Sequence, residues 1–163
     1  MTQSSRTINI LFCGTGGQGV LKAAEVCGWA ALFAGLHAKK SEVHGMAQRG
    51  GSVESHVRFG KEVFSPLIPK GTADILVAFH SGEEERLRPF LAPDGKNLLP
   101  FLVKAHEKGI NPFFLNTHLL GVLAAHLELP QEVWLQALEH EFRTKKLDEN
   151  KQIFLNGWKE VRP

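Results

Sequence analysis

Cysteine is scarce in this sequence of 163 residues, which contains only Cys13 and Cys27. Each lies in an apolar stretch, a pattern that fits buried thiols in a reducing compartment better than a disulfide framework. A cubane iron–sulfur cluster normally takes four thiolates, so this chain alone cannot hold one. We therefore expect a cytoplasmic protein that carries no cluster of its own.

The sequence also has little excess charge and no long apolar run. Lys and Arg together number 19 against 17 for Asp and Glu, and the pI is near 8.6. This balance is too even to indicate nucleic acid or an anionic membrane as a partner. No stretch approaches the roughly 18 apolar residues of a membrane span, and residues 1–7 lack the apolar core of a signal peptide. We expect neither a nucleic-acid partner nor a membrane partner.

Self-contained catalytic patterns are missing as well. The spacing of Cys and His offers no zinc site, and no pair of carboxylates or Ser-His-Asp set emerges, so we predict no catalytic and no metal-binding residue. Hydrophobic residues make up 43% of the chain and charged residues 22%, as in ordinary globular proteins. No repeat or linker divides the chain, and we expect one domain over residues 1–163.

A glycine-rich turn near the amino end is the first feature that points to a ligand. Residues 8–13 form a short apolar run, and after residue 19 the apolar positions recur at helical spacing. Between them Gly14, Gly16 and Gly19 fit the G-x-G-x-x-G fingerprint, which brings backbone close to a phosphate at a helix amino end. The candidate residues are Gly14, Thr15, Gly16, Gly17, Gln18 and Gly19. The alternative is a tight turn that binds nothing.

The stretch from residue 39 to 53 is unusually dense in Lys, His, Gln, Arg and Gly. Its glycines allow close backbone approach and its cations favour an anion, whereas the plainer interpretation is a basic, solvated loop. Two lysines precede Glu42, so a phosphate-bearing ligand fits better than NAD, although Glu42 keeps NAD open. The candidates here are Lys39, Lys40, Ser41, His44, Gly45, Gln48, Arg49 and Gly50.

The rest of the chain predicts the fold class. Residues 52–59 alternate like a half-exposed strand, with a hairpin turn at 60–61 into a strand at 62–65. Residues 74–79 read as a buried parallel strand followed by a helix over 83–90, with His80 and Ser81 either at the ligand crevice or, for Ser81, at the helix N-cap. Helices are expected over 119–127, with Asn116 or Thr117 as cap, then from Pro130, and finally around 153–161. We predict a three-layer, Rossmann-like α/β fold with a mostly parallel sheet, an inserted antiparallel hairpin and a helical carboxyl end.

Taken together, residues 14–19, 40–53, 65–69 and 74–76 resemble the gamma subunit, or gamma domain, of 2-oxoacid:ferredoxin oxidoreductases. Within that family, the segment over residues 40–53 is most similar to the indolepyruvate-oxidising branch; its sequence is Lys-Ser-Glu-Val-His-Gly-Met-Ala-Gln-Arg-Gly-Gly-Ser-Val. The resemblance covers residues 8 to about 95 closely and the remainder more loosely. Residues 95–116 look short against the family pattern, which puts one strand of the sheet in doubt.

The resemblance implies membership of a complex that oxidatively decarboxylates a 2-oxo acid, forms an acyl-coenzyme A and passes electrons to ferredoxin. It implies thiamine diphosphate, magnesium and iron–sulfur clusters on partner subunits, and coenzyme A on the side of this chain. The glycine turn would then hold a phosphate, with charge from Lys39, Lys40 and Arg49, while His44 and Gln48 orient the ligand or a neighbour. Two alternatives remain: a non-catalytic assembly module of that complex, and a free-standing NAD(P)-binding oxidoreductase.

Overall fold

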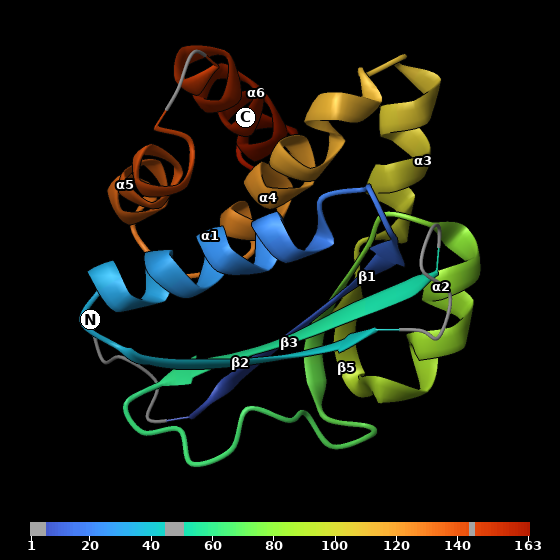
Figure 1. Ribbon diagram of the computed structural model, residues 1–163, viewed down its shortest axis with the longest axis vertical. Coiled ribbons are helices and arrows are strands. Elements are labelled where there is room, and N and C mark those ends of the chain that lie inside the picture. The colour runs from blue at the N-terminus through green and yellow to red at the C-terminus, as the bar shows by residue number, and fades with distance from the viewer. Residues whose placement is uncertain (1–5, 45–50, 144–145) are drawn as a thin grey trace.

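A five-stranded mixed sheet with helices on both faces forms the body of the protein in the computed structural model, which describes residues 6–44, 51–143 and 146–163 (Figure 1). The strands are β1 (Ile8–Thr15), β2 (His37–His44), β3 (Ser52–Gly60), β4 (Ala73–Ala78) and β5 (Leu91–Asn97). The α-helices are α1 (Val20–Phe33), α2 (Ser81–Leu87), α3 (Leu99–Glu107), α4 (Leu115–Ala125), α5 (Gln131–Glu141) and α6 (Leu147–Val161). Short 3-10 turns cover Arg88–Phe90 and Pro112–Phe114.

The strand order is β2-β3-β1-β4-β5. β1 pairs in parallel with β4, and β4 with β5, whereas β3 runs antiparallel to both β1 and β2. Four strands therefore point one way and β3 opposes them, which confirms the predicted α/β class. The doubted strand is present as β5, and residues 95–116 also hold α3.

The predicted hairpin is wrong, because the antiparallel neighbours of β3 are β1 and β2, and residues 62–65 form no strand. The Arg58 guanidinium donates to the carbonyls of Ser65 (2.8 Å) and Leu67 (3.3 Å). Carbonyls held by a side chain do not need a strand partner, and the prolines at 66 and 69 favour an extended connection. The segment after β3 thus crosses the sheet as a loop on its way to β4.

The two faces of the sheet have cores of unequal size. On one face α1 and α4 cover the strands, α5 and α6 pack on those helices, and the buried side chains form one large apolar cluster (Figure 1). On the other face α2 and the 61–72 connection cover a smaller cluster around Leu11, Leu76 and Leu87. The layered arrangement agrees with the predicted three layers, with additional helices outside the larger core.

The charged residues and the histidine of β3 lie on the face of the smaller core, and here the sequence prediction is again wrong. Glu54 and His56 are only 8% and 3% exposed, although the strand's alternation indicated a half-exposed strand. The period of two is correct, because Val53, Val57 and Phe59 belong to the larger core. Alternation reports which residues share a face, and it does not report what covers that face.

The carboxyl end is helical as expected, but the predicted cap of α4 is wrong. Asn116 and Thr117 lie inside the first turn, because the preceding 3-10 turn, capped by the Asn111 side chain at Phe113 N (3.0 Å), leads directly into α4. The Thr117 hydroxyl instead donates to Asn150 Oδ1 of α6 at 2.7 Å. In the described part of the chain, no helix combines the length and the apolar character that crossing a bilayer requires.

Candidate functional site

The glycine turn joins β1 to α1 as predicted. β1 continues through Thr15, which pairs with Ser52 of β3, and Gly19 is the N-cap residue of α1. Gly17 and Gly19 have φ values of +89° and +80°, a left-handed conformation that side-chain-bearing residues rarely adopt. The strand-turn-helix unit is confirmed, and its glycines are where the backbone requires them.

Gln18 closes the turn from within. Its Oε1 accepts from Thr15 N at 2.7 Å, and its Nε2 donates to the carbonyl of Phe79 at 2.9 Å, just beyond the end of β4. A Cβ on Gly14 would lie 2.7 Å from Gln18 Oε1 and 2.8 Å from Val20 Cγ2. Gly14 therefore makes room for a carboxamide that clamps the ends of β1 and β4 together, which is a structural role for Gln18.

Several backbone amides of the turn are already satisfied. Gly16 N donates to Gly51 O at 3.0 Å, and Gln18 N donates to Thr15 O at 3.2 Å. Among the described residues, none accepts a hydrogen bond from Gly17 N or Gly19 N. These two amides, at the amino end of the 14-residue α1, are the donors that the turn can offer to an anion.

The structure separates the two predicted groups of candidates more than the sequence indicated. His44 pairs with Val53, which in turn pairs with Gly14, so His44 lies at the same end of the sheet as the turn. Lys39 pairs with Arg58 and lies toward the other end of β2, with its Nζ 3.4 Å from the carbonyl of Phe64. The predicted Gly45, Gln48, Arg49 and Gly50 lie outside the described residues.

Lys40 is occupied by carboxylates of its own chain. Its Nζ forms ion pairs with Glu25 of α1 and, at 2.6 Å, with Glu42. Burial opposes the charged ammonium, but the hydrogen bonds to Glu25 and Glu42 outweigh it and raise the pKa of Lys40. Ser41 follows in the middle of the strand. The described structure thus brings Gly51 next to the turn and places His44 at the same end of the sheet, and it does not bring Lys39, Lys40 or Ser41 to the turn.

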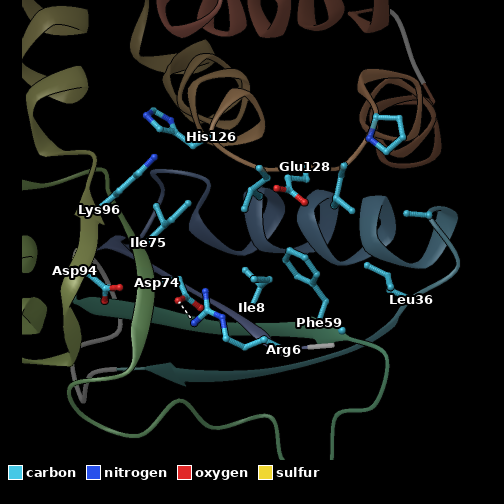
Figure 2. Close-up of a pocket in the computed structure, with 15 residues that line it drawn as sticks. Arg6, Ile8, Leu36, Phe59, Asp74, Ile75, Asp94, Lys96, His126 and Glu128 are labelled. Atoms are coloured by element: carbon cyan, nitrogen blue, oxygen red, sulfur yellow. Dashed lines mark hydrogen bonds and ion pairs between the residues drawn. The ribbon is translucent and has the colours of Figure 1, made fainter. Parts of the chain in front are cut away.

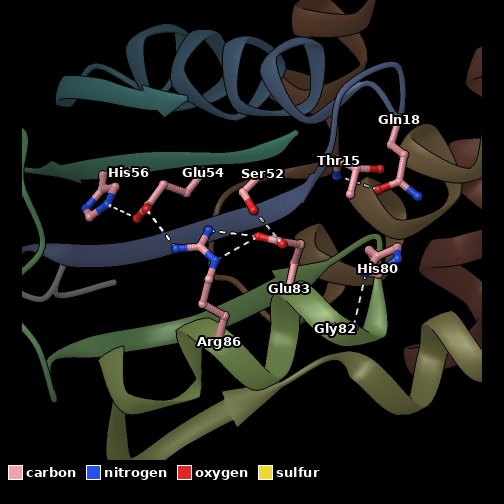
Figure 3. A network of polar contacts seen from close by, with 9 residues as sticks. All are labelled: Thr15, Gln18, Ser52, Glu54, His56, His80, Gly82, Glu83 and Arg86. Atoms are coloured by element: carbon pink, nitrogen blue, oxygen red, sulfur yellow. Dashed lines mark hydrogen bonds and ion pairs between the residues drawn. The ribbon is translucent and has the colours of Figure 1, made fainter. Parts of the chain in front are cut away.

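The end of β4 also reaches this region. Here His80, and not Ser81, is the N-cap of α2, because the His80 Nδ1 accepts from Gly82 N at 3.1 Å. A ring nitrogen two residues before the amide substitutes for the usual hydroxyl, so the predicted Ser81 cap is wrong. Figure 3 shows the contact between His80 and Gly82. His80 directly follows Phe79, whose carbonyl accepts from Gln18 Nε2.

A polar network that the sequence did not reveal lies below the turn and joins β3 to α2 (Figure 3). Ser52 Oγ donates to Glu83 Oε1 at 2.7 Å, and Arg86 donates to the other Glu83 oxygen at 2.8 and 3.0 Å. Arg86 Nη1 also reaches Glu54 at 3.4 Å. The alternation of β3 and the Glu83–Arg86 spacing were the available signals, but only the tertiary fold brings them together.

The inner end of this network fixes a histidine. His56 Nδ1 accepts from Ile68 N at 3.0 Å, so its Nε2 carries the proton and donates to Glu54 at 2.9 Å. This hydrogen bond, aided by the charge of Arg86, outweighs burial and lowers the pKa of Glu54. Burial, reinforced by the charge of Glu83, raises the pKa of the nearby Cys13 thiol to about 12, so Cys13 is protonated and unreactive at neutral pH.

A cavity of about 860 Å³ lies at the opposite end of the sheet (Figure 2). Its walls come from the starts of β1 and β4, the ends of α1 and β3, part of β5, and the connection between α4 and α5. Ionisable side chains of both signs line it. Arg6 forms an ion pair with Asp74 at 2.8 Å, and Lys96, Asp94, His126 and Glu128 also lie on its walls, among apolar residues (Figure 2). We refer to this region as the open end and to the region of residues 14–19 as the turn end.

No group of three or more His, Cys, Asp or Glu side chains in residues 6–44, 51–143 and 146–163 could hold a metal ion. The turn end supplies backbone donors, and the network below it keeps α2 against β3. Residues 9–101 match the family model described as pyruvate ferredoxin/flavodoxin oxidoreductase.

The chain belongs to that family. It is 47% identical over 87 residues to the indolepyruvate oxidoreductase subunit IorB of Thermococcus kodakarensis, a match covering 53% of this chain and 43% of the relative. The chain thus matches less than half the length of that relative.

Solved structures of two other proteins share the fold of this family member. The gamma subunit of a keto/oxoacid ferredoxin oxidoreductase from Geobacter sulfurreducens superposes with a TM-score of 0.69 and 21% identity, covering 95% of this chain and 98% of that one. The second structure is a 2-oxoglutarate:ferredoxin oxidoreductase from Magnetococcus marinus, solved with 2-oxoglutarate, coenzyme A and succinyl-CoA bound. It superposes with a TM-score of 0.77 and 20% identity, covering 96% of this chain and 31% of that one. Both structures therefore share the fold of this chain over nearly its whole length.

Proposed function

We propose that this chain is a subunit of a 2-oxoacid:ferredoxin oxidoreductase of the indolepyruvate type. The complex oxidatively decarboxylates a 2-oxo acid, joins the acyl group to coenzyme A and transfers two electrons to ferredoxin. The observation that carries this proposal is the 47% identity over 87 residues to an indolepyruvate oxidoreductase subunit. The family model matches residues 9–101, which include the glycine turn. Thiamine diphosphate, magnesium and the iron–sulfur clusters belong on partner subunits, and the complex is cytoplasmic.

The contribution of this chain is a binding surface for the phosphate-bearing part of coenzyme A. The amides of Gly17 and Gly19 at the amino end of α1 fit an anion, since a helix amino end attracts negative charge. In this proposal His44 and Gln48 orient the ligand and Arg49 supplies positive charge. Lys39, Lys40 and Ser41 lie further along β2, away from the turn.

The test is to purify the chain from its host together with the subunits that accompany it. We expect indolepyruvate-dependent reduction of a viologen dye that requires coenzyme A. Arg49→Ala should weaken coenzyme A binding to this complex at least about tenfold, because one charge-assisted contact to phosphate is lost. Lys96→Ala removes a cation at the open end and serves as the matched control.

Other outcomes favour the other functions. If Arg49→Ala leaves coenzyme A affinity unchanged but the subunits no longer co-purify, the surface serves assembly alone. Saturable binding of NADPH by the isolated chain, followed by fluorescence, would identify a free-standing nicotinamide enzyme instead. Reduction of the dye without coenzyme A would contradict the proposed reaction.

A further inference from the structure

The two edges of the sheet differ in how they are protected against pairing with another strand. β5 contains Pro93, Asp94, Gly95 and Lys96, and its register with β4 shifts between Ala73 and Ile75. Proline, charge and an irregular register are the devices by which sheets block edge-to-edge pairing. The β5 edge is therefore protected against pairing with another strand.

The β2 edge has neither a proline nor an irregular register within the strand. All eight residues from His37 to His44 pair with β3 in one continuous register, and the strand contains no proline. Its two lysines do not guard it: Lys40 is neutralised by Glu25 and Glu42, and Lys39 is directed to the Phe64 carbonyl. In the part of the chain that the structure describes, β3 is the only strand beside β2, so every second residue presents unpaired backbone groups outward.

The sequence of this edge is complementary to itself. A two-fold axis perpendicular to the sheet must place one residue opposite its own copy, because facing residues of antiparallel strands point to the same side. With Ser41 on the axis, Lys40 faces Glu42 of the second copy and Glu42 faces its Lys40. Moving the axis to Lys40 or to Glu42 instead sets like charges opposite each other, which is unfavourable.

The surroundings of the edge leave space for a second copy. On the helix side, a groove of about 160 Å³ lies between α1 and β2, lined by Glu25, Gly28 and Leu32 together with residues of the strand. A Cβ on Gly28 would meet no atom within 4 Å, and Leu32 is 46% exposed. On the other side Val43 is 43% exposed, and in the Ser41-centred register it faces the aliphatic stem of the second copy's Lys39.

We propose that β2 is a homodimerisation edge, through which two copies of this chain form a continuous ten-stranded sheet about a two-fold axis at Ser41. The occupant is a second copy because the charge pattern Lys40-Ser41-Glu42 matches its own reverse. This inference does not depend on the proposed reaction, since it concerns only described residues of one edge strand.

A cysteine placed on the axis tests the register directly. Cα atoms of residues facing each other across antiparallel strands lie about 4.5–5.5 Å apart, which suits a disulfide. Ser41→Cys should therefore give a covalent dimer under mild oxidation. Val43→Cys is the matched control, because position 43 faces position 39 of the other copy. The native Cys13 and Cys27 are buried and do not compete.

Charge reversal tests the partner. In a Glu25→Gln background, which removes the intrachain carboxylate beside residue 40, Lys40→Glu or Glu42→Lys should each weaken the dimer about tenfold in analytical ultracentrifugation. The two changes together should restore it, because opposite charges again face each other. A monomer at all concentrations, cross-linking of Val43→Cys as fast as Ser41→Cys, or no recovery in the double variant overturns the proposal.

Discussion

The turn end and the open end of the sheet are built in opposite ways. At the turn end, the Gln18 carboxamide, the Gly51 carbonyl and the Glu83–Arg86 network fill the space between strands, and little is left except backbone amides. The open end encloses about 860 Å³ with charges of both signs on its walls. Open α/β sheets bind ligands beyond the carboxyl ends of their parallel strands, and this is the turn end. The difference shows that cavity size and the position expected for ligand binding need not coincide in one fold.

The largest expected effect comes from adding a methyl group to a glycine at each end, which compares how tightly the two ends are packed. Gly14→Ala would place a Cβ 2.7–3.2 Å from Gln18, Val20 and Phe79, and we expect the free energy of unfolding in urea to fall by about 3 kcal/mol. At the open end Gly60→Ala meets its nearest atom, Thr7 Cα, at 3.2 Å, and we expect a loss of about 1 kcal/mol. Equal losses would contradict the view that the turn end is the tighter one.

A second comparison concerns the carboxamide clamp. Gln18→Glu keeps the acceptor for Thr15 N but replaces the donor to the Phe79 carbonyl by a carboxylate oxygen, so two acceptors face each other. We expect the free energy of unfolding to fall by about 2 kcal/mol, because polar groups that are partly buried lose their hydrogen-bond partner. The reverse exchange at the open end, Glu128→Gln, changes an exposed side chain and should stay within about 0.5 kcal/mol. If Gln18→Glu changes the free energy of unfolding as little as Glu128→Gln does, the carboxamide does not hold the strands together.

The turn end was predictable from sequence because its signals are local. The apolar run of β1, the glycines and the helical spacing after Gly19 lie within about 25 consecutive residues, and each follows from backbone geometry. Gly14 illustrates the limit of that reasoning. Its fit to the phosphate fingerprint was visible, but the Gln18 carboxamide that it accommodates is bonded to Phe79, which lies 61 residues along the chain.

The sequence predictions that were wrong concern features that depend on contacts between distant parts of the chain. The alternation of β3 was read correctly, but its neighbours are β1 and β2, and no short-range rule selects them over residues 62–65. The burial of Glu54 and His56 likewise depends on α2 and on the Ile68 amide, which come from later in the chain. Lys39 and Lys40 were assigned to a basic, glycine-rich binding stretch because of their charge, whereas they lie within β2. The ion pairs of Lys40 with Glu25 and Glu42 depend on the packing of α1 beside β2, which local sequence does not reveal.

The smallest expected effect is a difference in pH dependence between the two ends. Burial lowers the pKa of His126 at the open end; the Val122 carbonyl opposes this, and the charges of Lys96 and Arg162 add to it. The unfolded chain then binds a proton before the folded chain does, so stability is full above the ordinary value of 6.5 and is lost as pH falls through the lowered pKa. At the turn end the pKa of Glu54 is also lowered, and its contribution is lost only as pH falls below the ordinary 4.5.

Urea titrations at a series of pH values separate these two contributions. His126→Gln should flatten the fall in stability between pH 7 and 5.5 by less than about 1 kcal/mol, and Glu54→Gln should leave that interval unchanged while flattening the fall below pH 4.5. His118 is the necessary control, because burial lowers its pKa as well and its loss lies in the same interval, although it belongs to neither end. If His118→Gln flattens the fall in stability between pH 7 and 5.5 and His126→Gln does not, then His126 does not contribute in that interval. The two ends would then differ in packing but not in electrostatics.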